Sequence, residues 1–219
     1  MLLAGATGLV GGLLLQRLEQ RSDVSSVIAL GRKPFSVSLS KIETMIAPIE
    51  DWPCAIGNTK PDIAISTLGT TIRAAGSQEA FAAIDHDAVV AFARAARGEG
   101  ARRFMLVSSV SAHAGSRNHY LAVKGRTEAS VQAVGFDRVD IFRPGLLRGN
   151  RQGEIRISER FAMLLSPLTD ILTPHVLDHF RSIAASDVAA AIAAMIDSDE
   201  GGTFIHENRA MWEAAKTAH

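Results

Sequence analysis

The chain alternates short apolar, often β-branched runs with longer segments in which apolar residues recur at helical spacing. The apolar runs predict buried strands at residues 24–30, 43–48, 62–67, 103–109, 138–142 and 203–207. Helical spacing marks three later segments, residues 77–100, 120–135 and 186–196. Strands that alternate with helices form a parallel sheet covered on both faces. We therefore predict an α/β fold of the doubly wound, Rossmann type.

The ends of these helices carry recognisable signals. Ser77 and Ser186 are candidate N-caps, and Asp187 adds a negative charge to the first turn that follows Ser186. The first long helix is expected to stop at Gly98 or Gly100, and the second at residue 135.

The pattern changes after Pro144, where helical fragments are broken by Pro167 and Pro174 and no buried strand is evident before residue 203. We expect residues 146–185 to form a small helical cap on the substrate side. The 219 residues, 47% of them hydrophobic, suffice for one core, so residues 1–219 are predicted to form a single domain.

Charge narrows the range of partners. Lys plus Arg and Asp plus Glu number 23 each, which argues against nucleic acid and against a membrane surface, and favours a small-molecule partner. No run reaches the roughly 20 apolar residues of a membrane span. The single cysteine, Cys54, excludes an internal disulfide, and a cytoplasmic location is expected.

Three glycines near the start, Gly5, Gly8 and Gly11, lie between the apolar residues Leu2 to Ala4 and a helical run. In a doubly wound sheet this turn meets a helix N-terminus, whose free N–H groups bind a pyrophosphate. A purely structural turn is the alternative. The predicted dinucleotide contacts are Gly5, Thr7, Gly8, Leu9, Val10 and Gly11. Only four residues precede Gly5, so we expect a short first strand, from which a few starting residues are missing.

The second strand ends in "ALGRKP". An NAD site would place an acidic residue there for the ribose hydroxyl. Arg32 instead can bind a 2′-phosphate through its guanidinium, and Lys33 adds a second charge, so NADP(H) is favoured over NAD(H). A solvated basic turn is the alternative.

The single tyrosine, Tyr120, precedes Lys124 by four residues, which places both on one helix face. A neighbouring ammonium favours the phenolate, so this pair can exchange a proton with a reacting oxygen. Ser108 and Ser109 end the preceding strand at the edge where ligands bind. A serine there can hydrogen-bond a carbonyl oxygen. A surface helix pair and turn-capping serines are the alternative.

These residues resemble the short-chain dehydrogenase/reductase superfamily, and more closely its atypical branch around the oxidoreductase Tat-interacting protein. The resemblance is carried by "GATGLVGG", "STLGTT", "YLAVKGRTE" and "FDRVDIFRPGLLRGNR", and covers roughly the first 150 residues. It implies a Rossmann fold that binds NADP(H). It also implies a catalytic set of Ser109, Tyr120 and Lys124, with Ser108 and Ser111 as rivals to Ser109. Tyr120 and Lys124 would also contact the cofactor, where Lys124 would hold the nicotinamide ribose.

The same resemblance assigns further cofactor contacts. Ser66, Thr67, Leu68 and Gly69 would pass beside the adenosine and pyrophosphate, and Ser108 would lie nearby. Pro144, Gly145 and Leu146 would border the nicotinamide. Many members of the superfamily pair through the two helices that correspond to residues 85–97 and 120–131, so a homodimer is the alternative to a monomer.

Other motifs are discounted. His175 and His179 lack a third ligand, so no metal site is predicted. Asp85 and Asp87 flank His86, and this arrangement suggests a charge relay. The sequence has no G-x-S-x-G turn to supply a nucleophile, so a helical position over the sheet is favoured. Cys54 has no base within sequence reach, so a thiol nucleophile is not expected.

The sequence therefore predicts an NADP(H)-dependent short-chain reductase or dehydrogenase that acts on a carbonyl or alcohol of a small organic substrate. Two alternatives stay open. One is a regulatory protein that senses NADPH without turnover, and the other is a nucleotide-sugar epimerase or dehydratase.

Overall fold

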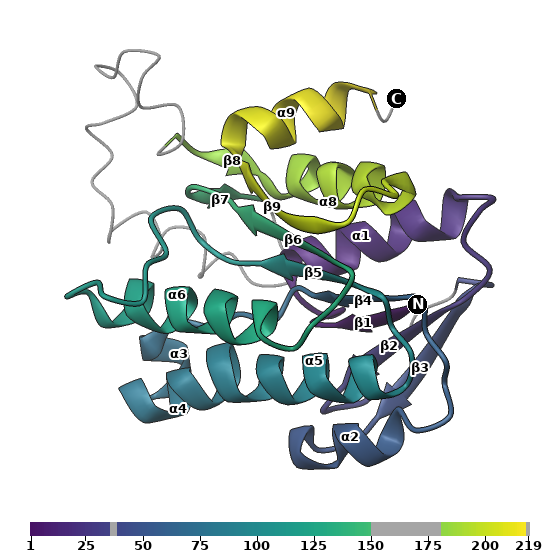
Figure 1. Cartoon of the computed structure of the whole chain (residues 1–219), viewed down its shortest axis with the longest axis horizontal. Helices are drawn as coiled ribbons and strands as arrows, with labels where there is room; N and C mark the ends of the chain where they lie inside the picture. The colour runs from purple at the N-terminus through teal and green to yellow at the C-terminus, as the bar shows by residue number, and fades with distance from the viewer. Residues whose placement is uncertain (36–38, 150–180, 218–219) are drawn as a thin grey trace.

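A parallel seven-stranded sheet forms the centre of the protein, as seen in a computed structural model that describes residues 1–35, 39–149 and 181–217 (Figure 1). Its strand order is β3-β2-β1-β4-β5-β6-β9. The strands are β1 (Leu2–Ala4), β2 (Val27–Gly31), β3 (Ile42–Ile46), β4 (Ile63–Ser66), β5 (Arg103–Val107), β6 (Arg138–Arg143) and β9 (Gly202–Glu207). Each predicted strand is present, and the doubly wound α/β prediction is confirmed.

Helices cover both faces of the sheet (Figure 1). One face carries α1 (Leu9–Gln20), α8 (Ala185–Ala194) and α9 (Asn208–Thr217). The other side carries α2 (Trp52–Ala55), α3 (Ile72–Ala75), α4 (Gln78–Ala82), α5 (Ala88–Gly98) and α6 (His119–Gln132). Among the described helices, none has the length and apolarity needed to cross a membrane.

The short strand β1 lies inside the sheet, between β2 and β4, and is completely buried. Leu3 pairs with Ala29 of β2 and Ile65 of β4. Because side chains alternate along a strand, Leu3 joins the core beneath α1 and α8, whereas Leu2 joins the core beneath α5. Three residues therefore contribute to both cores.

The predicted helix at 77–100 begins as expected, because the Ser77 Oγ accepts a hydrogen bond from the Ala80 N–H at 3.0 Å. It then departs from regularity. Residues Ala83–Asp87 form a π-helical turn, η2, between α4 and α5. The predicted end of this helix at Gly98 or Gly100 is confirmed, since α5 ends at Gly98 and Gly100 has a φ of +103°. A π-helical turn inserts one extra residue and thereby reorients the side chains around it.

The predicted Ser186 cap is wrong. Helix α8 begins at Ala185, and Ala184, which has extended backbone, occupies the N-cap position. The reason is that Ile183–Ala184 form a short strand, β8, that passes directly into the helix. Asp187 does lie in the first turn.

Strand β8 pairs in parallel with β7 (Leu147–Arg148). These two strands lie near the ends of the predicted cap, whose residues 150–180, including His175 and His179, lie outside the described residues. No helix was predicted after residue 207, yet α9 follows β9 and buries Met211 against the core.

A buried polar cluster joins the last two strands. Asp140 of β6 has no exposed surface and accepts hydrogen bonds from the Arg138 guanidinium at 2.7 and 2.8 Å. The His206 Nε2 of β9 lies 2.8 Å from the same carboxylate. Burial opposes ionisation of Asp140, but the hydrogen bonds from His206 and Arg138 outweigh it and lower the Asp140 pKa.

Candidate active site

The glycine turn links β1 to α1 at the carboxyl edge of the sheet. Gly5 has a φ of +89°, and a Cβ there would lie 2.6 Å from the Thr67 backbone. A Cβ on Gly11 would lie 2.2 Å from the Gly5 carbonyl oxygen. Both positions therefore require glycine, because the turn packs against the end of β4 and against its own helix.

Helix α1 starts without a side-chain cap. Gly8 holds the N-cap position and has no side chain to satisfy the first N–H groups. Thr7 is exposed, and Leu9 is half-buried, whereas Val10 is buried in the core and can offer only its backbone. This uncapped N-terminus is suited to an anion.

The segment after β4 lies against the glycine turn. The Thr67 N–H and hydroxyl both donate to the Ala4 carbonyl, at 2.9 and 3.1 Å. Leu68 is half-buried and Gly69 is exposed. The two predicted dinucleotide segments are thus brought together by tertiary contacts.

The predicted 2′-phosphate residues follow β2. Arg32 and Lys33 are both exposed, directly beyond Gly31 at the carboxyl end of the strand. The structure places them at the same sheet edge as the glycine turn.

Tyr120 and Lys124 lie one turn apart on α6, whose N-cap Asn118 accepts a hydrogen bond from the Leu121 N–H at 3.3 Å. The half-buried Tyr120 ring stacks on Phe81 of α4, with centroids 5.4 Å apart and planes at 29°. Within the described chain, its hydroxyl has no hydrogen-bond partner.

Lys124 is buried and forms an ion pair with Asp85. The Lys124 Nζ lies 2.7 Å from the Asp85 Oδ1, and the two side chains are 6% and 0% exposed. Burial lowers the pKa of the ammonium, but the Asp85 charge, with smaller contributions from Tyr120 and Glu128, outweighs it, so the Lys124 pKa is raised. Lys124 therefore carries a persistent positive charge beneath the site.

Asp85 is the residue that sequence analysis discounted. It does occupy a helical position over the sheet, as expected, but within the π-helical turn η2. Its Oδ2 accepts the Thr70 N–H at 2.8 Å, and its backbone carbonyl accepts the Thr127 hydroxyl at 2.8 Å. A Cβ on Gly69 would lie 3.8 Å from both the carboxylate and the Lys124 ammonium. The feature of the sequence that could have identified Asp85 is an acidic residue within an otherwise apolar helical pattern.

The three candidate serines have different surroundings. Ser108 is 6% exposed, and its hydroxyl donates a hydrogen bond to the carboxylate of Glu128 on α6. Ser109 is half-buried, and Ser111 is exposed with a φ of +61°. The segment that follows these serines packs against α6 at Gly125, where a Cβ would lie 2.2 Å from the Ala114 nitrogen.

The predicted nicotinamide segment follows β6. Pro144 is buried, while Gly145 and Leu146 are half-buried. The Gly145 N–H donates to the side chain of Asn208 at 2.9 Å, and Asn208 donates to the Arg181 carbonyl at 2.6 Å. Asn208, at the start of α9, was missed by sequence analysis because no pattern linked the C-terminal region to this loop.

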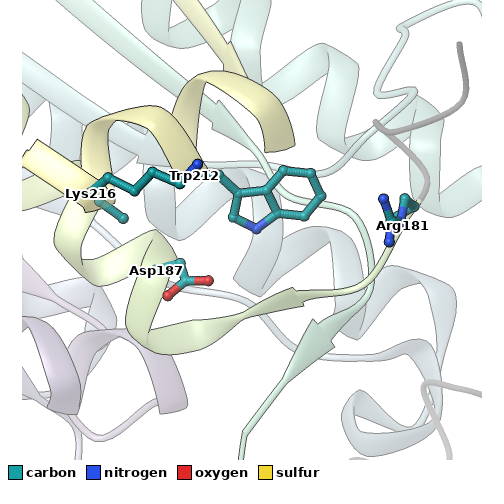
Figure 2. A pocket seen from close by; sticks show the side chains of 5 residues that line it. Arg181, Asp187, Trp212 and Lys216 are labelled. Carbon is teal, nitrogen blue, oxygen red and sulfur yellow. The ribbon is translucent and has the colours of Figure 1, made fainter. Parts of the chain in front are cut away.

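A separate hollow lies on the α8–α9 side of the sheet (Figure 2). Arg181 lies over the Trp212 ring, with 6.0 Å between the guanidinium carbon and the ring centroid. Asp187 and Lys216 complete the charged lining, and Ala215 contributes to the wall. Tyr120 and Lys124 lie on α6, on the opposite side (Figure 1).

The fold, the uncapped glycine turn and the strand order define a dinucleotide-binding protein of the Rossmann class. Residues 5–199 match the family model described as NAD(P)H-binding, and the chain belongs to this family. This membership agrees with the resemblance to the atypical short-chain dehydrogenases/reductases.

Two curated relatives are fungal proteins named "Protein FMP52, mitochondrial". The one from Meyerozyma guilliermondii is 38% identical over 153 residues, which cover 69% of this chain and 66% of that protein, just under two thirds of its length. The one from Coccidioides immitis is 33% identical over 218 residues, which cover 91% of this chain and 88% of that protein.

A solved structure supports the fold. The Bordetella bronchiseptica enzyme WbmH, in complex with NAD+, aligns with a TM-score of 0.67 at 15% identity. The alignment covers 94% of this chain and 74% of that one.

The expected cytoplasmic location is wrong, because both curated relatives carry a mitochondrial location in their names. The expectation rested on a lone cysteine. A lone cysteine excludes an internal disulfide but does not distinguish one compartment without disulfides from another.

Proposed function

We propose that the protein is an NADPH-dependent reductase of the short-chain type, which reduces the carbonyl group of a small organic substrate or oxidises the corresponding alcohol. The observation that carries this proposal is the buried Asp85–Lys124 ion pair one helical turn from Tyr120, whose hydroxyl is unengaged within the described residues. A purely structural helix pair would not require a buried ammonium at this edge of the sheet.

The residues present fit a dinucleotide. The glycines at positions 5 and 11 let the turn pack closely, and the N-terminus of α1 leaves backbone N–H groups for a pyrophosphate. Arg32 and Lys33 offer two cations at the end of β2 for a 2′-phosphate, which supports NADPH as the preferred cofactor.

When bound, the dinucleotide supplies the hydride that the carbonyl carbon accepts. Tyr120 donates its hydroxyl proton to the carbonyl oxygen as that oxygen gains charge. The Lys124 ammonium stabilises the phenolate that remains, and Asp85 keeps this ammonium charged and in place. Ser109 donates a hydrogen bond to the same oxygen. In the reverse direction, the Tyr120 phenolate accepts the proton of the alcohol oxygen.

The curated relatives' names support a mitochondrial location for this chain, where a small-molecule substrate would be its partner. The relatives' names do not describe a reaction, so the proposal rests on the geometry of the site.

The test is NADPH oxidation by the purified protein against a panel of aldehydes and ketones, with Tyr120→Phe as the variant. General acid catalysis contributes about 100- to 10,000-fold, so Tyr120→Phe should lower kcat by at least about 100-fold. NADPH affinity, followed by nicotinamide fluorescence, should change little. Full activity in this variant would remove Tyr120 from the reaction.

Wild-type protein that binds NADPH but oxidises it with no substrate in the panel would contradict the reductase proposal. That outcome would instead support a protein that senses NADPH without turnover. Failure to bind either NADPH or NADH would contradict both.

A further inference from the structure

Helix α6 presents a third polar side chain on the face that carries Tyr120 and Lys124. Glu128 follows Lys124 by four residues, and it is 3% exposed. Residues four apart share one helix face, so the three side chains form a row along the helix. The reaction proposed above uses the first two and gives Glu128 no part.

The Glu128 carboxylate binds two segments of the sheet edge. It accepts a hydrogen bond from the hydroxyl of Ser108, the residue that follows β5. It also accepts two hydrogen bonds from the guanidinium of Arg143, the last residue of β6, through Nε at 3.0 Å and Nη2 at 2.5 Å. A forked guanidinium–carboxylate contact fixes direction as well as distance.

The two segments that Glu128 joins also run beside each other. The Ser108 N–H donates to the Phe142 carbonyl at 2.7 Å, and the Val110 N–H donates to the Pro144 carbonyl at 2.9 Å. The β5–β6 ladder therefore continues past β5. One carboxylate ties α6 to the segment that contains Ser109 and to the one that contains Pro144.

This arrangement separates the three serines. The Ser108 hydroxyl is buried and donates its hydrogen bond to the Glu128 carboxylate, so it is not available to a substrate. The Ser109 hydroxyl has no hydrogen-bond partner within residues 1–35, 39–149 and 181–217, and the residue is half-buried. Ser111 is exposed and lies beyond the residues that pair with β6.

We propose that Glu128 is a positioning residue: through Ser108 and Arg143 it holds the segments of Ser109 and Pro144 in register with Tyr120 and Lys124, and it leaves Ser109 as the serine that meets the reacting oxygen. This inference rests on the proposed function. A buried charged contact is suited to such a role because its geometry is specific, whereas apolar contacts tolerate sliding.

The test compares Glu128→Gln, Ser108→Ala and Ser109→Ala. Ser130→Ala is the matched control, because Ser130 lies on the same helix and its hydroxyl is hydrogen-bonded to the His86 ring, at 3.1 Å, and not to the Glu128 contacts. A misplacement near 1 Å costs about 100-fold, so Glu128→Gln should lower kcat by about 10- to 100-fold while the NADPH dissociation constant stays within about threefold. Ser109→Ala should lower kcat by about 100-fold. Ser108→Ala removes one of the two contacts of Glu128 but keeps the Ser109 hydroxyl, so it should lower kcat by a smaller factor, about 3- to 10-fold.

A second variant guards against misfolding. Arg143→Lys keeps the positive charge but loses the forked contact with the carboxylate, so it should lower kcat by a smaller factor than Glu128→Gln does. Equal losses in Ser108→Ala and Ser109→Ala would overturn the assignment of Ser109. A Glu128→Gln variant with wild-type kcat would overturn the positioning role.

Hydrogen exchange distinguishes failure of this inference from failure of the reductase proposal. The amides of Ser108 and Val110 should exchange faster in Glu128→Gln than in wild type or Ser130→Ala, whether or not any substrate is turned over. Unchanged protection at these amides would overturn the inference by itself. Absence of turnover in the wild type would instead contradict the proposed function.

Discussion

Asp85 and Lys124 come from different helices and meet in a buried ion pair of 2.7 Å beneath Gly69. Each of these two buried charges is compensated by the other. Removal of Asp85 should leave a buried ammonium without its main partner.

The first prediction is that Asp85→Ala lowers the free energy of unfolding by about 3–5 kcal/mol, because breaking a buried pair leaves an uncompensated charge. Lys124→Met in the same chain should restore a large part of this loss. Denaturant titration of the two single variants and the double variant measures the effect. A double variant no more stable than Asp85→Ala would contradict the account.

The same pair predicts a dependence on pH. In the wild type the raised Lys124 pKa means that its stabilising contribution is complete below the ordinary value of 10.5 and is lost only above the raised one. In Asp85→Ala, burial lowers the pKa of the lysine instead, so the unfolded state binds more protons and stability rises with pH. The stability gap to wild type should therefore be smaller at pH 9.5 than at pH 7. An equal gap at both values would contradict this.

Two neighbouring glycines of α1 offer a matched test of the dinucleotide turn. A Cβ on Gly11 would lie 2.2 Å from the Gly5 carbonyl oxygen, whereas one on Gly12 would lie 3.6 Å from the Ala6 carbonyl oxygen, an ordinary contact. Gly11→Ala should displace the turn and weaken NADPH binding at least about tenfold, through lost hydrogen bonds to phosphate. Gly12→Ala should bind NADPH normally and gain up to about 1 kcal/mol in helix stability.

Cofactor choice is tested at Arg32. Arg32→Ala should weaken NADPH binding by about 10- to 100-fold, the worth of charged hydrogen bonds to one phosphate, and leave NADH binding unchanged. Arg94→Ala, an exposed arginine on α5, is the control. Fluorescence titration with each nucleotide measures both affinities. Equal weakening for NADPH and NADH would remove Arg32 from the recognition of the 2′-phosphate.

Acid stability is predicted to depend on Asp140. Because its pKa lies below its ordinary value of 3.8, this carboxylate contributes stability above that value and loses it as the pH falls through the lower one. Asp140→Asn should cost about 1.5–3 kcal/mol at pH 6, since Arg138 and His206 lose a charged acceptor. The gap to wild type should narrow below pH ~4. A constant gap down to pH 2 would contradict this.

Local patterns were sufficient for most of the sheet. Strands such as 63–66 and 103–107 are short, apolar and bounded by polar residues, so periodicity alone located them. The glycine turn was found because its glycines recur at a fixed spacing between an apolar run and a helix. The contact that requires Gly11 lies within the turn, whereas the one that requires Gly5 comes from Thr67 at the end of β4. The spacing of Tyr120 and Lys124 likewise fixed their common face.

The partners of those residues could not be predicted, because they depend on contacts between distant segments. Asp85 reaches Lys124 through a π-helical turn that no helical pattern reveals. Glu128 could be placed on the Lys124 face, but its bonds to Ser108 and Arg143 require the alignment of α6 with two strand ends. The cap was predicted from a change of pattern, and residues 150–180 lie outside the described structure.

The pairing of β7 with β8 has a consequence for how this protein can diversify. Leu147 pairs with Ile183 and Arg148 with Ala184, so the connection between the two strands begins and ends at adjacent points. The entropy of closing such a connection depends only weakly on its length. Insertions or deletions between β7 and β8 should therefore leave the geometry of the glycine turn unchanged.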